Sequence, residues 1–167
     1  MPHTGPGKIP HPPHADPPAS AALLGAPELD VALLAFLLHF VWEFWQVPWY
    51  QGMNDLPHLA GVLMCSRAAA GDAVIALTAY AGPALMARSR FWARDASLRL
   101  LAAYLGIGLT ITVGLEWLAT EVLDRWQYVD VMPTLPLLGT GLAPLLQWIV
   151  LPLLLLWLLR RAWRPLG

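Results

Sequence analysis

Long runs of hydrophobic residues dominate the chain, and short segments that carry most of the charge separate them. Three runs are long enough to cross about 30 Å of hydrocarbon as helices, namely 31–50, 98–120 and 135–159. A fourth run, 73–87, comes close to that length once the small residues before it are included, which gives a span of 70–87. The pattern predicts an all-α polytopic membrane protein, built as a bundle of four transmembrane helices.

Composition agrees with this prediction. Hydrophobic residues make up 57% of the chain and charged residues only 13%, whereas about a quarter of the residues of a soluble domain are charged. One shorter apolar segment, 56–65, lies between the first two predicted spans and cannot cross the membrane by itself. We expect it to form a short re-entrant or interfacial segment. A five-span arrangement would require this segment to be extended.

The first 27 residues differ from the rest. They hold eight of the 16 prolines and three of the five histidines, a composition that cannot bury a hydrophobic core. Residues 1–27 are therefore predicted to be a disordered Pro/His-rich tail, followed by a transmembrane domain at 28–167. No basic start with an adjoining apolar core and a small-residue cleavage site is present, so we expect no removable signal peptide.

Arginines gather in two of the polar segments. They are Arg88, Arg90, Arg94 and Arg99 after the second span, and Arg160, Arg161 and Arg164 at the C-terminus. The other two connections carry only Arg67 and Arg125. Because cytoplasmic segments of membrane proteins are enriched in Lys and Arg, both termini are predicted to face the cytosol. The excess of arginine over lysine, with many alanines and leucines, suggests a bacterial protein from a GC-rich genome and hence the inner (cytoplasmic) membrane.

Four polar side chains within the first span recur on one helical face. They are His39, Glu43, Gln46 and Tyr50. At 100° per residue, their offsets of four, seven and eleven place them in one narrow arc. An acidic group at the bilayer centre costs roughly 2.5 to 3.5 kcal/mol on insertion scales, so such residues usually face the protein interior and mark functional sites. We predict that this stripe lines a ligand-binding pocket.

Residues from the other spans are expected to complete the pocket. The candidates are Tyr80, Glu116 and Gln147. Glu43 and Glu116 both lie toward the predicted outer ends of their spans, so the pocket should open outward. Asp72 is interpreted differently, as the N-terminal cap of the second span, because a carboxylate at that position can accept hydrogen bonds from free backbone N–H groups.

Motifs for defined chemistry are scarce. The sequence contains no G-x-S-x-G, H-E-x-x-H or C-x-x-C motif and no phosphate-binding glycine loop, and nothing in it indicates nucleic-acid binding. A single cysteine excludes an intrachain disulfide. His39, Glu43 and His58 are candidate metal ligands, but the sequence identifies neither a metal nor a cofactor.

Small residues recur every fourth position along the third span. They are Ala102, Gly106, Thr110 and Gly114, which we call the small-residue face. Such a face lets another helix approach closely. It predicts contact with a membrane-protein partner or with a second copy of the chain.

Three functions fit these features. The favoured one is a pocket that binds a cation, a proton or an amphiphilic small molecule in the membrane. The second is a membrane enzyme that uses His39 and Glu43 as an acid–base pair on a lipid or isoprenoid. The third is a structural or accessory subunit that docks onto a larger complex through the small-residue face.

Overall fold

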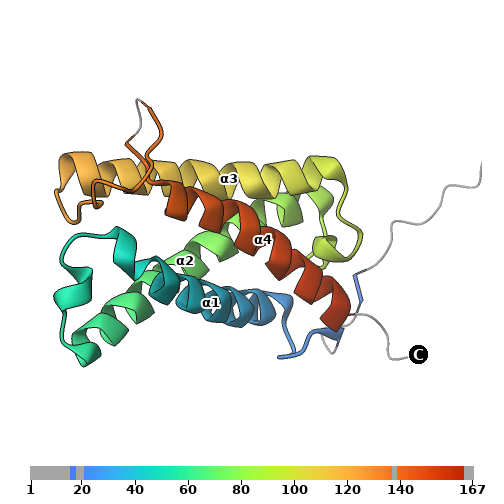
Figure 1. Ribbon diagram of the computed structural model, residues 1–167. Coiled ribbons are helices and arrows are strands. Elements are labelled where there is room, and N and C mark those ends of the chain that lie inside the picture. Colours follow the sequence, from blue (N-terminus) through green and yellow to red (C-terminus); the bar gives the residue numbers. More distant parts are fainter. Residues whose placement is uncertain (1–15, 18–20, 137–138, 164–167) are drawn as a thin grey trace, which may run out of the picture.

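The computed structural model describes residues 16–17, 21–136 and 139–163, and within them it contains four long helices (Figure 1). The helices are α1 (Pro27–Gln46), α2 (His58–Ala87), α3 (Leu98–Trp117) and α4 (Leu142–Ala162). Short 3₁₀ turns are η2 (Val47–Trp49), η3 (Met53–Asp55) and η4 (Trp92–Asp95), and a π-helical turn, η5 (Leu118–Val122), extends α3. All four long helices are apolar enough to span a membrane, which confirms the predicted fold class.

The four helices form a ring. α1 packs against α2 and α4, and α3 packs against the same two helices. The α1–α2 and α3–α4 connections lie together at one end of the bundle, whereas the start of α1, the α2–α3 connection and the end of α4 lie at the other (Figure 1). Because the chain reverses direction at each connection, neighbouring helices run antiparallel (Figure 1).

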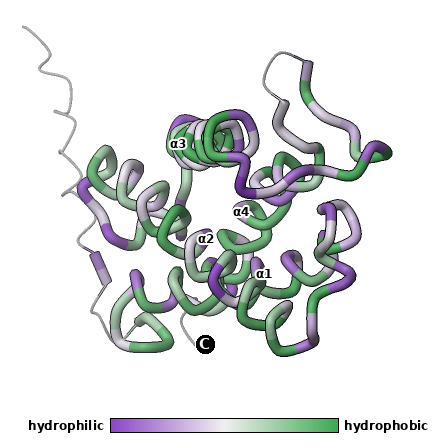
Figure 2. The backbone as a smooth tube through the Cα atoms, turned by 90° about the vertical axis from the view of Figure 1, so that its left-hand side faces the viewer, coloured by the Kyte–Doolittle hydropathy of each residue, from purple (hydrophilic) through white to green (hydrophobic). Residues whose placement is uncertain are grey.

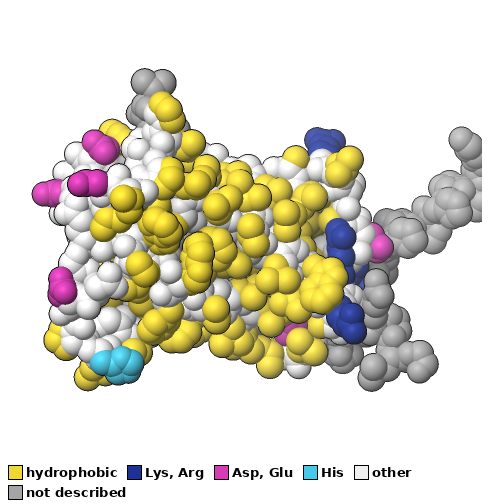
Figure 3. Space-filling view, in the orientation of Figure 1, with side chains coloured by type: hydrophobic (Ala, Val, Ile, Leu, Met, Phe, Trp, Pro, Cys, Tyr) yellow, Lys and Arg dark blue, Asp and Glu magenta, His cyan; other side chains and the backbone are white. Residues whose placement is uncertain are grey.

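Charge is segregated between the two ends. Figure 3 shows hydrophobic side chains over the middle of the molecule, most of the visible acidic side chains at one end and the visible arginines at the other. Exposed acidic residues at what we call the acidic end are Asp55, Glu121, Asp124 and Asp130; the arginine end carries Arg88, Arg90, Arg94, Arg99, Arg160 and Arg161. From the acidic end, the helices are seen as mostly hydrophobic tubes (Figure 2). This distribution fits a small integral membrane protein.

Small side chains hold α2 close to its neighbours. Its buried face is a series of alanines, Ala69, Ala73, Ala76 and Ala79, which let the neighbouring backbones approach. Gly108 has the same effect on α3. A Cβ atom there would lie only 2.6 Å from the ring of Trp148, so the indole packs directly against the helix backbone.

The start of α2 differs from the sequence prediction. The expected re-entrant or interfacial segment at 56–65 is not confirmed, because its residues from His58 onward form the first turns of α2. Residues 66–70 contain neither glycine nor proline, so nothing interrupts the helix before the predicted span. The 30 residues of α2 make a helix about 45 Å long. It is longer than the hydrocarbon layer, and it must tilt or project beyond it.

The start of α4 also differs. The predicted span begins at 135, but the helix begins at Leu142. Pro133 and Pro136 lie in the preceding loop, and Gly139 has a φ of 65°, a left-handed conformation that a helix does not continue through. The sequence prediction extended the apolar run through these residues because their hydropathy resembles that of the helix.

The predicted N-terminal tail lies largely outside the described residues. Its last part, 21–27, is described and leads directly into α1. Pro27 is the first residue of that helix, where its fixed φ is favourable and its missing N–H costs no hydrogen bond.

The small-residue face of α3 points away from the bundle. All four of its residues are exposed, and nothing lies within 4 Å of where a Cβ atom would stand at Gly106 or Gly114. In the part of the chain that the structure describes, no helix packs on this face. The expected contact with a partner stays a prediction.

Candidate functional site

Four polar side chains from three helices meet in the half of the bundle nearer the acidic end. His39 and Glu43 come from α1, Asp72 from α2 and Gln147 from α4; we call them the Gln147 cluster. Gln147 Nε2 lies 2.8 Å from His39 Nδ1, 3.1 Å from Glu43 Oε1 and 3.0 Å from Asp72 Oδ2. His39 and Gln147 are each only 2% exposed. The cluster therefore concentrates two carboxyl groups and an imidazole around one amide nitrogen.

The cluster has more acceptors than hydrogens. An amide nitrogen carries two hydrogens, whereas three possible acceptors surround Gln147 Nε2. If His39 Nδ1 carries a hydrogen, it can donate to Asp72 Oδ2, 3.2 Å away. That hydrogen would then also point toward the NH₂ group of Gln147, which is itself a donor. Rotating the amide by 180° would place its oxygen against both carboxylates. Each arrangement leaves at least one acceptor without a hydrogen or one contact unfavourable, and an added proton or cationic group would supply what is missing.

Side chains of α1 and α4 hold the cluster in place. Trp42 Nε1 donates to Gln46 Oε1 over 3.2 Å, and Gln46 Nε2 donates to Glu43 Oε1 over 2.8 Å. The Trp148 ring lies beside the imidazole of His39, with 5.2 Å between the ring centroids. These contacts orient Glu43 and His39 toward α2 and α4, and a fixed orientation is what a binding site requires.

A cavity of about 390 Å³ adjoins the cluster on the side of the acidic end. Its polar lining comprises Glu43, Gln46, Tyr50, Arg67, Asp72, Thr112, Glu116, Arg125 and Gln147. Its apolar lining includes Val47, Met53, Met64, Ile75, Leu115, Trp126 and Trp148. The buried hydroxyl of Thr112 has no hydrogen-bond partner among the described residues. The volume, the apolar walls and the few converging polar groups are typical of small-molecule sites.

The two connections at the acidic end are tied together beside this cavity. Gln51 N donates to Gln127 O over 2.9 Å, and Val129 N donates to Trp49 O over 3.1 Å. Between these bonds, Tyr50 and Tyr128 form an isolated β-bridge. Since both connections are fixed to each other, the rim has a defined shape even though it consists of loops.

The α3–α4 connection also supplies partners for Glu116. The Tyr128 hydroxyl donates a short hydrogen bond to the Glu116 carboxylate, and Trp126 Nε1 lies 3.4 Å from the same oxygen. Burial, together with the neighbouring Glu116 carboxylate, raises the pKa of the Tyr128 phenol. The phenol therefore stays protonated near neutral pH and remains a hydrogen-bond donor.

The structure brings together all but one of the residues predicted to bind a ligand. Glu43, Gln46, Tyr50, Glu116 and Gln147 line the cavity, and His39 contacts Gln147. Tyr80 lies elsewhere. It is eight residues beyond Asp72, about 12 Å along α2, and its hydroxyl donates to the carbonyl oxygen of Arg90 over 2.8 Å at the arginine end.

Asp72 was missed as a site residue, and its predicted role as a helix cap is wrong. Because α2 begins at His58, Asp72 lies near the middle of the helix and not at its start. Extending the helix backward through residues 66–70 would have revealed a carboxylate in mid-membrane, which is the same signal that drew attention to Glu43.

The candidate metal ligands are not all together. His58 lies 14 residues before Asp72, about 21 Å away along α2, so it cannot join His39 and Glu43. Across the described ranges, no group of three or more His, Cys, Asp or Glu side chains is arranged to hold a metal ion.

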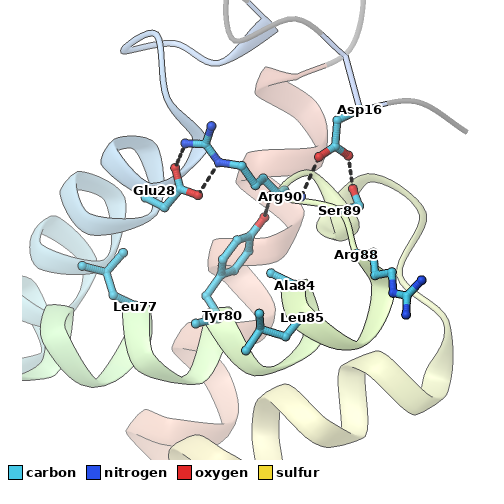
Figure 4. Close-up of a pocket in the computed structure, with 10 residues that line it drawn as sticks. Asp16, Glu28, Leu77, Tyr80, Ala84, Leu85, Arg88, Ser89 and Arg90 are labelled. Carbon is cyan, nitrogen blue, oxygen red and sulfur yellow. Dashed lines mark hydrogen bonds and ion pairs between the residues drawn. The ribbon is translucent and has the colours of Figure 1, made fainter.

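A second cavity, of about 440 Å³, lies at the arginine end (Figure 4). Most of its charged groups already form ion pairs or hydrogen bonds with other residues of the chain. Arg90 pairs with Glu28, and the Asp16 carboxylate accepts hydrogen bonds from the Ser89 hydroxyl and the Arg90 backbone N–H. Because these charges are already paired, this cavity offers a ligand fewer free polar groups than the one beside the Gln147 cluster.

The Gln147 cluster can do two kinds of chemistry. It can accept hydrogen bonds from a cationic group, and it can pass a proton between His39 and a carboxyl group. Comparison with known proteins gives no precedent for either, since no protein-family model, no curated protein and no solved structure matches the chain.

Proposed function

We propose that this integral membrane protein binds a small amphiphilic molecule through a primary ammonium group, in the cavity beside the Gln147 cluster. The observation that carries the proposal is the convergence of Glu43, Asp72 and His39 on a single point where only two hydrogens are supplied. An ammonium group brings three N–H donors and a positive charge. It would satisfy the carboxylates with charge-assisted hydrogen bonds, which are stronger than neutral ones.

The apolar part of the ligand follows from the cavity walls. A volume of about 390 Å³ exceeds what a bare ion or a proton requires. Trp126, Trp148 and Leu115 would bury hydrocarbon, and Met64 would adapt to its shape. A molecule with an ammonium head and an alkyl portion matches both regions of the cavity.

Octylamine is a suitable probe. We expect the protein in lipid nanodiscs to bind radiolabelled octylamine above the background of empty nanodiscs. Glu43→Gln should weaken binding at least tenfold, because it removes the charge that faces the ammonium group. The matched control is Glu121→Gln, an exposed carboxylate at the same end that does not line the cavity. Wild-type affinity in a folded Glu43→Gln variant would refute the proposal.

We also propose that the protein resides in the bacterial inner membrane with the acidic end outside. The arginine end supports this orientation by the positive-inside rule. Cys65, the single cysteine, is buried and is replaced by alanine for the test. In that background, Gln51→Cys should react with a membrane-impermeant maleimide in intact spheroplasts, and Arg99→Cys should not. The opposite pattern would reverse the orientation.

The pairing of His39 with Asp72 favours a second candidate, a membrane enzyme acting on a lipid or isoprenoid. An imidazole oriented by a carboxylate, with Glu43 beside it, is an arrangement that supports proton transfer. Incubation with a bacterial lipid extract and mass spectrometry of the products would detect such turnover, and His39→Gln should abolish it. Turnover that persists in His39→Gln would exclude this role for the cluster.

A further inference from the structure

The charged residues of the cavity are ordered along the bundle. Glu43 and Asp72 belong to the Gln147 cluster, in the interior, whereas Arg67 and Arg125 are exposed. Arg67 precedes Asp72 by five residues on α2, which places it about 7.5 Å nearer the acidic end. Arg125 lies in the α3–α4 connection, beyond the end of η5. Both arginines of the cavity lining thus lie nearer its mouth than Glu43 and Asp72 do, while the third carboxyl group of the lining, Glu116, is bound by Tyr128 and Trp126.

These opposite charges do not neutralise each other directly. Neither Arg67 nor Arg125 forms an ion pair within 4.0 Å anywhere in the described chain, although both line the cavity with three carboxyl groups. Thr112 lies in the same lining, and its buried hydroxyl has no partner among the described residues. Separated charges and an unpartnered hydroxyl in one cavity match a ligand that carries both signs of charge.

Building on the proposed function, we infer that the ligand is a zwitterion in which a short linker joins a primary ammonium group to a phosphate. The ammonium lies at Glu43 and Asp72, and the phosphate lies at Arg67 and Arg125. Arginine presents several N–H donors in a planar fork that matches phosphate oxygens. The same chemistry occurs in an ethanolamine phospholipid headgroup and in free phosphoethanolamine.

A set of matched probes tests each part of this ligand. Octylphosphoethanolamine carries both charges, octylamine only the ammonium, and octyl phosphate only the phosphate. Octylphosphocholine keeps both charges but has no N–H donors. We expect octylphosphoethanolamine to bind at least tenfold more tightly than each of the other three. Phosphoethanolamine lacks the chain, and binding as tight as that of the octyl compound would support the charge assignment and identify a water-soluble ligand.

Variants at the mouth separate the two charge sites. Arg67→Gln and Arg125→Gln should each weaken octylphosphoethanolamine binding at least fivefold but should not weaken octylamine binding, because losing a positive charge does not disfavour an ammonium group. The control is Arg99→Gln, an exposed arginine at the other end, which should affect neither probe. Unchanged thermal unfolding of each variant shows that the fold is kept, as expected for substitutions of exposed side chains.

The outcomes distinguish this inference from the proposed function. Equal binding of octylamine and octylphosphoethanolamine would overturn the zwitterion and leave the ammonium site intact. Equal binding of octylphosphocholine and octylphosphoethanolamine would show that N–H donors are not required and would overturn both. Octyl phosphate binding as tightly as the zwitterion, or no binding of any probe, would likewise overturn both.

Discussion

Buried carboxyl groups occur in both halves of the molecule, and their surroundings differ. Near the arginine end, Asp30 is only 1% exposed. Its oxygens accept hydrogen bonds from the backbone N–H groups of Leu23 and Leu24, each over 2.8 Å, and from Trp163 Nε1 over 2.6 Å. Three fixed donors thus serve a single carboxylate. The interaction joins the residues before α1 to α1 itself and to the residue that follows α4.

Near the acidic end the balance is reversed. Glu43, Asp72 and His39 surround the nitrogen of Gln147, which has two hydrogens, and a cavity adjoins them. Burial alone therefore does not identify a binding site. A buried carboxylate with a full set of donors ties the chain together, whereas a cluster that lacks donors and faces a cavity is suited to a ligand.

The largest effect on stability should come from Asp30→Ala. Removing the carboxylate leaves the buried indole N–H of Trp163 without an acceptor and frees the backbone of Leu23 and Leu24, so we expect a loss of about 3 kcal/mol or more. Thermal unfolding in detergent would measure it, with the exposed Asp95→Ala as the control. Unchanged stability would show that Asp30 is not the anchor described here.

The packing of Trp148 against Gly108 should give the next largest effect. Gly108→Ala would force a Cβ atom against Trp148 and should cost about 1 to 3 kcal/mol. Gly106→Ala is the matched control on the same helix. Its Cβ would meet open space, and alanine is the better helix former by about 0.8 to 1 kcal/mol. If both variants have the same free energy of unfolding, Trp148 does not pack rigidly against Gly108.

Asp72→Asn should separate stability from binding. The amide of asparagine would give the cluster another donor, so we expect stability to be unchanged or higher by up to about 1 kcal/mol. Octylamine binding should fall at least tenfold because a negative charge is lost. Parallel unfolding and binding measurements test this. A loss of stability comparable to that of Asp30→Ala would erase the proposed difference between the two halves.

The smallest effect should come from the exposed ion pair at the arginine end. Glu28→Gln removes the partner of Arg90, but water and salt screen exposed pairs and reduce their contribution. We expect an unfolding temperature close to that of the wild type, with any difference vanishing at high salt. A salt-independent loss would indicate that this pair, like Asp30, is part of the structural framework.

Much of the fold could be predicted because the length and hydropathy of each apolar run are local properties of the chain. The beginnings of α2 and α4 could not be derived in this way. Hydropathy does not distinguish the glycine- and proline-containing loop before Leu142 from helix. Ser66 and Arg67 separate two apolar runs in the sequence, although both runs belong to one helix that continues unbroken from His58.

The site was predictable only in part, for a related reason. Helical periodicity placed His39, Glu43 and Gln46 on one face, and Gln147 and Glu116 were candidates as polar residues within other predicted spans. Periodicity does not reveal which residue of another helix lies opposite. The contact between Asp72 and Gln147, like that between Asp30 and Trp163, joins residues far apart in sequence and depends on the packing of the whole ring.

The side-chain amide of Gln147 reports directly on whether an ammonium group joins the cluster. In ¹H–¹⁵N NMR spectra of protein labelled at glutamine, octylamine should shift the Gln147 NH₂ resonances in a saturable manner, because their acceptors would then be shared with the ligand. The exposed amides of Gln51 and Gln127 should not move. If the Gln147 resonances stay in place while octylamine binds, the ligand lies elsewhere and no ammonium group binds at the Gln147 cluster.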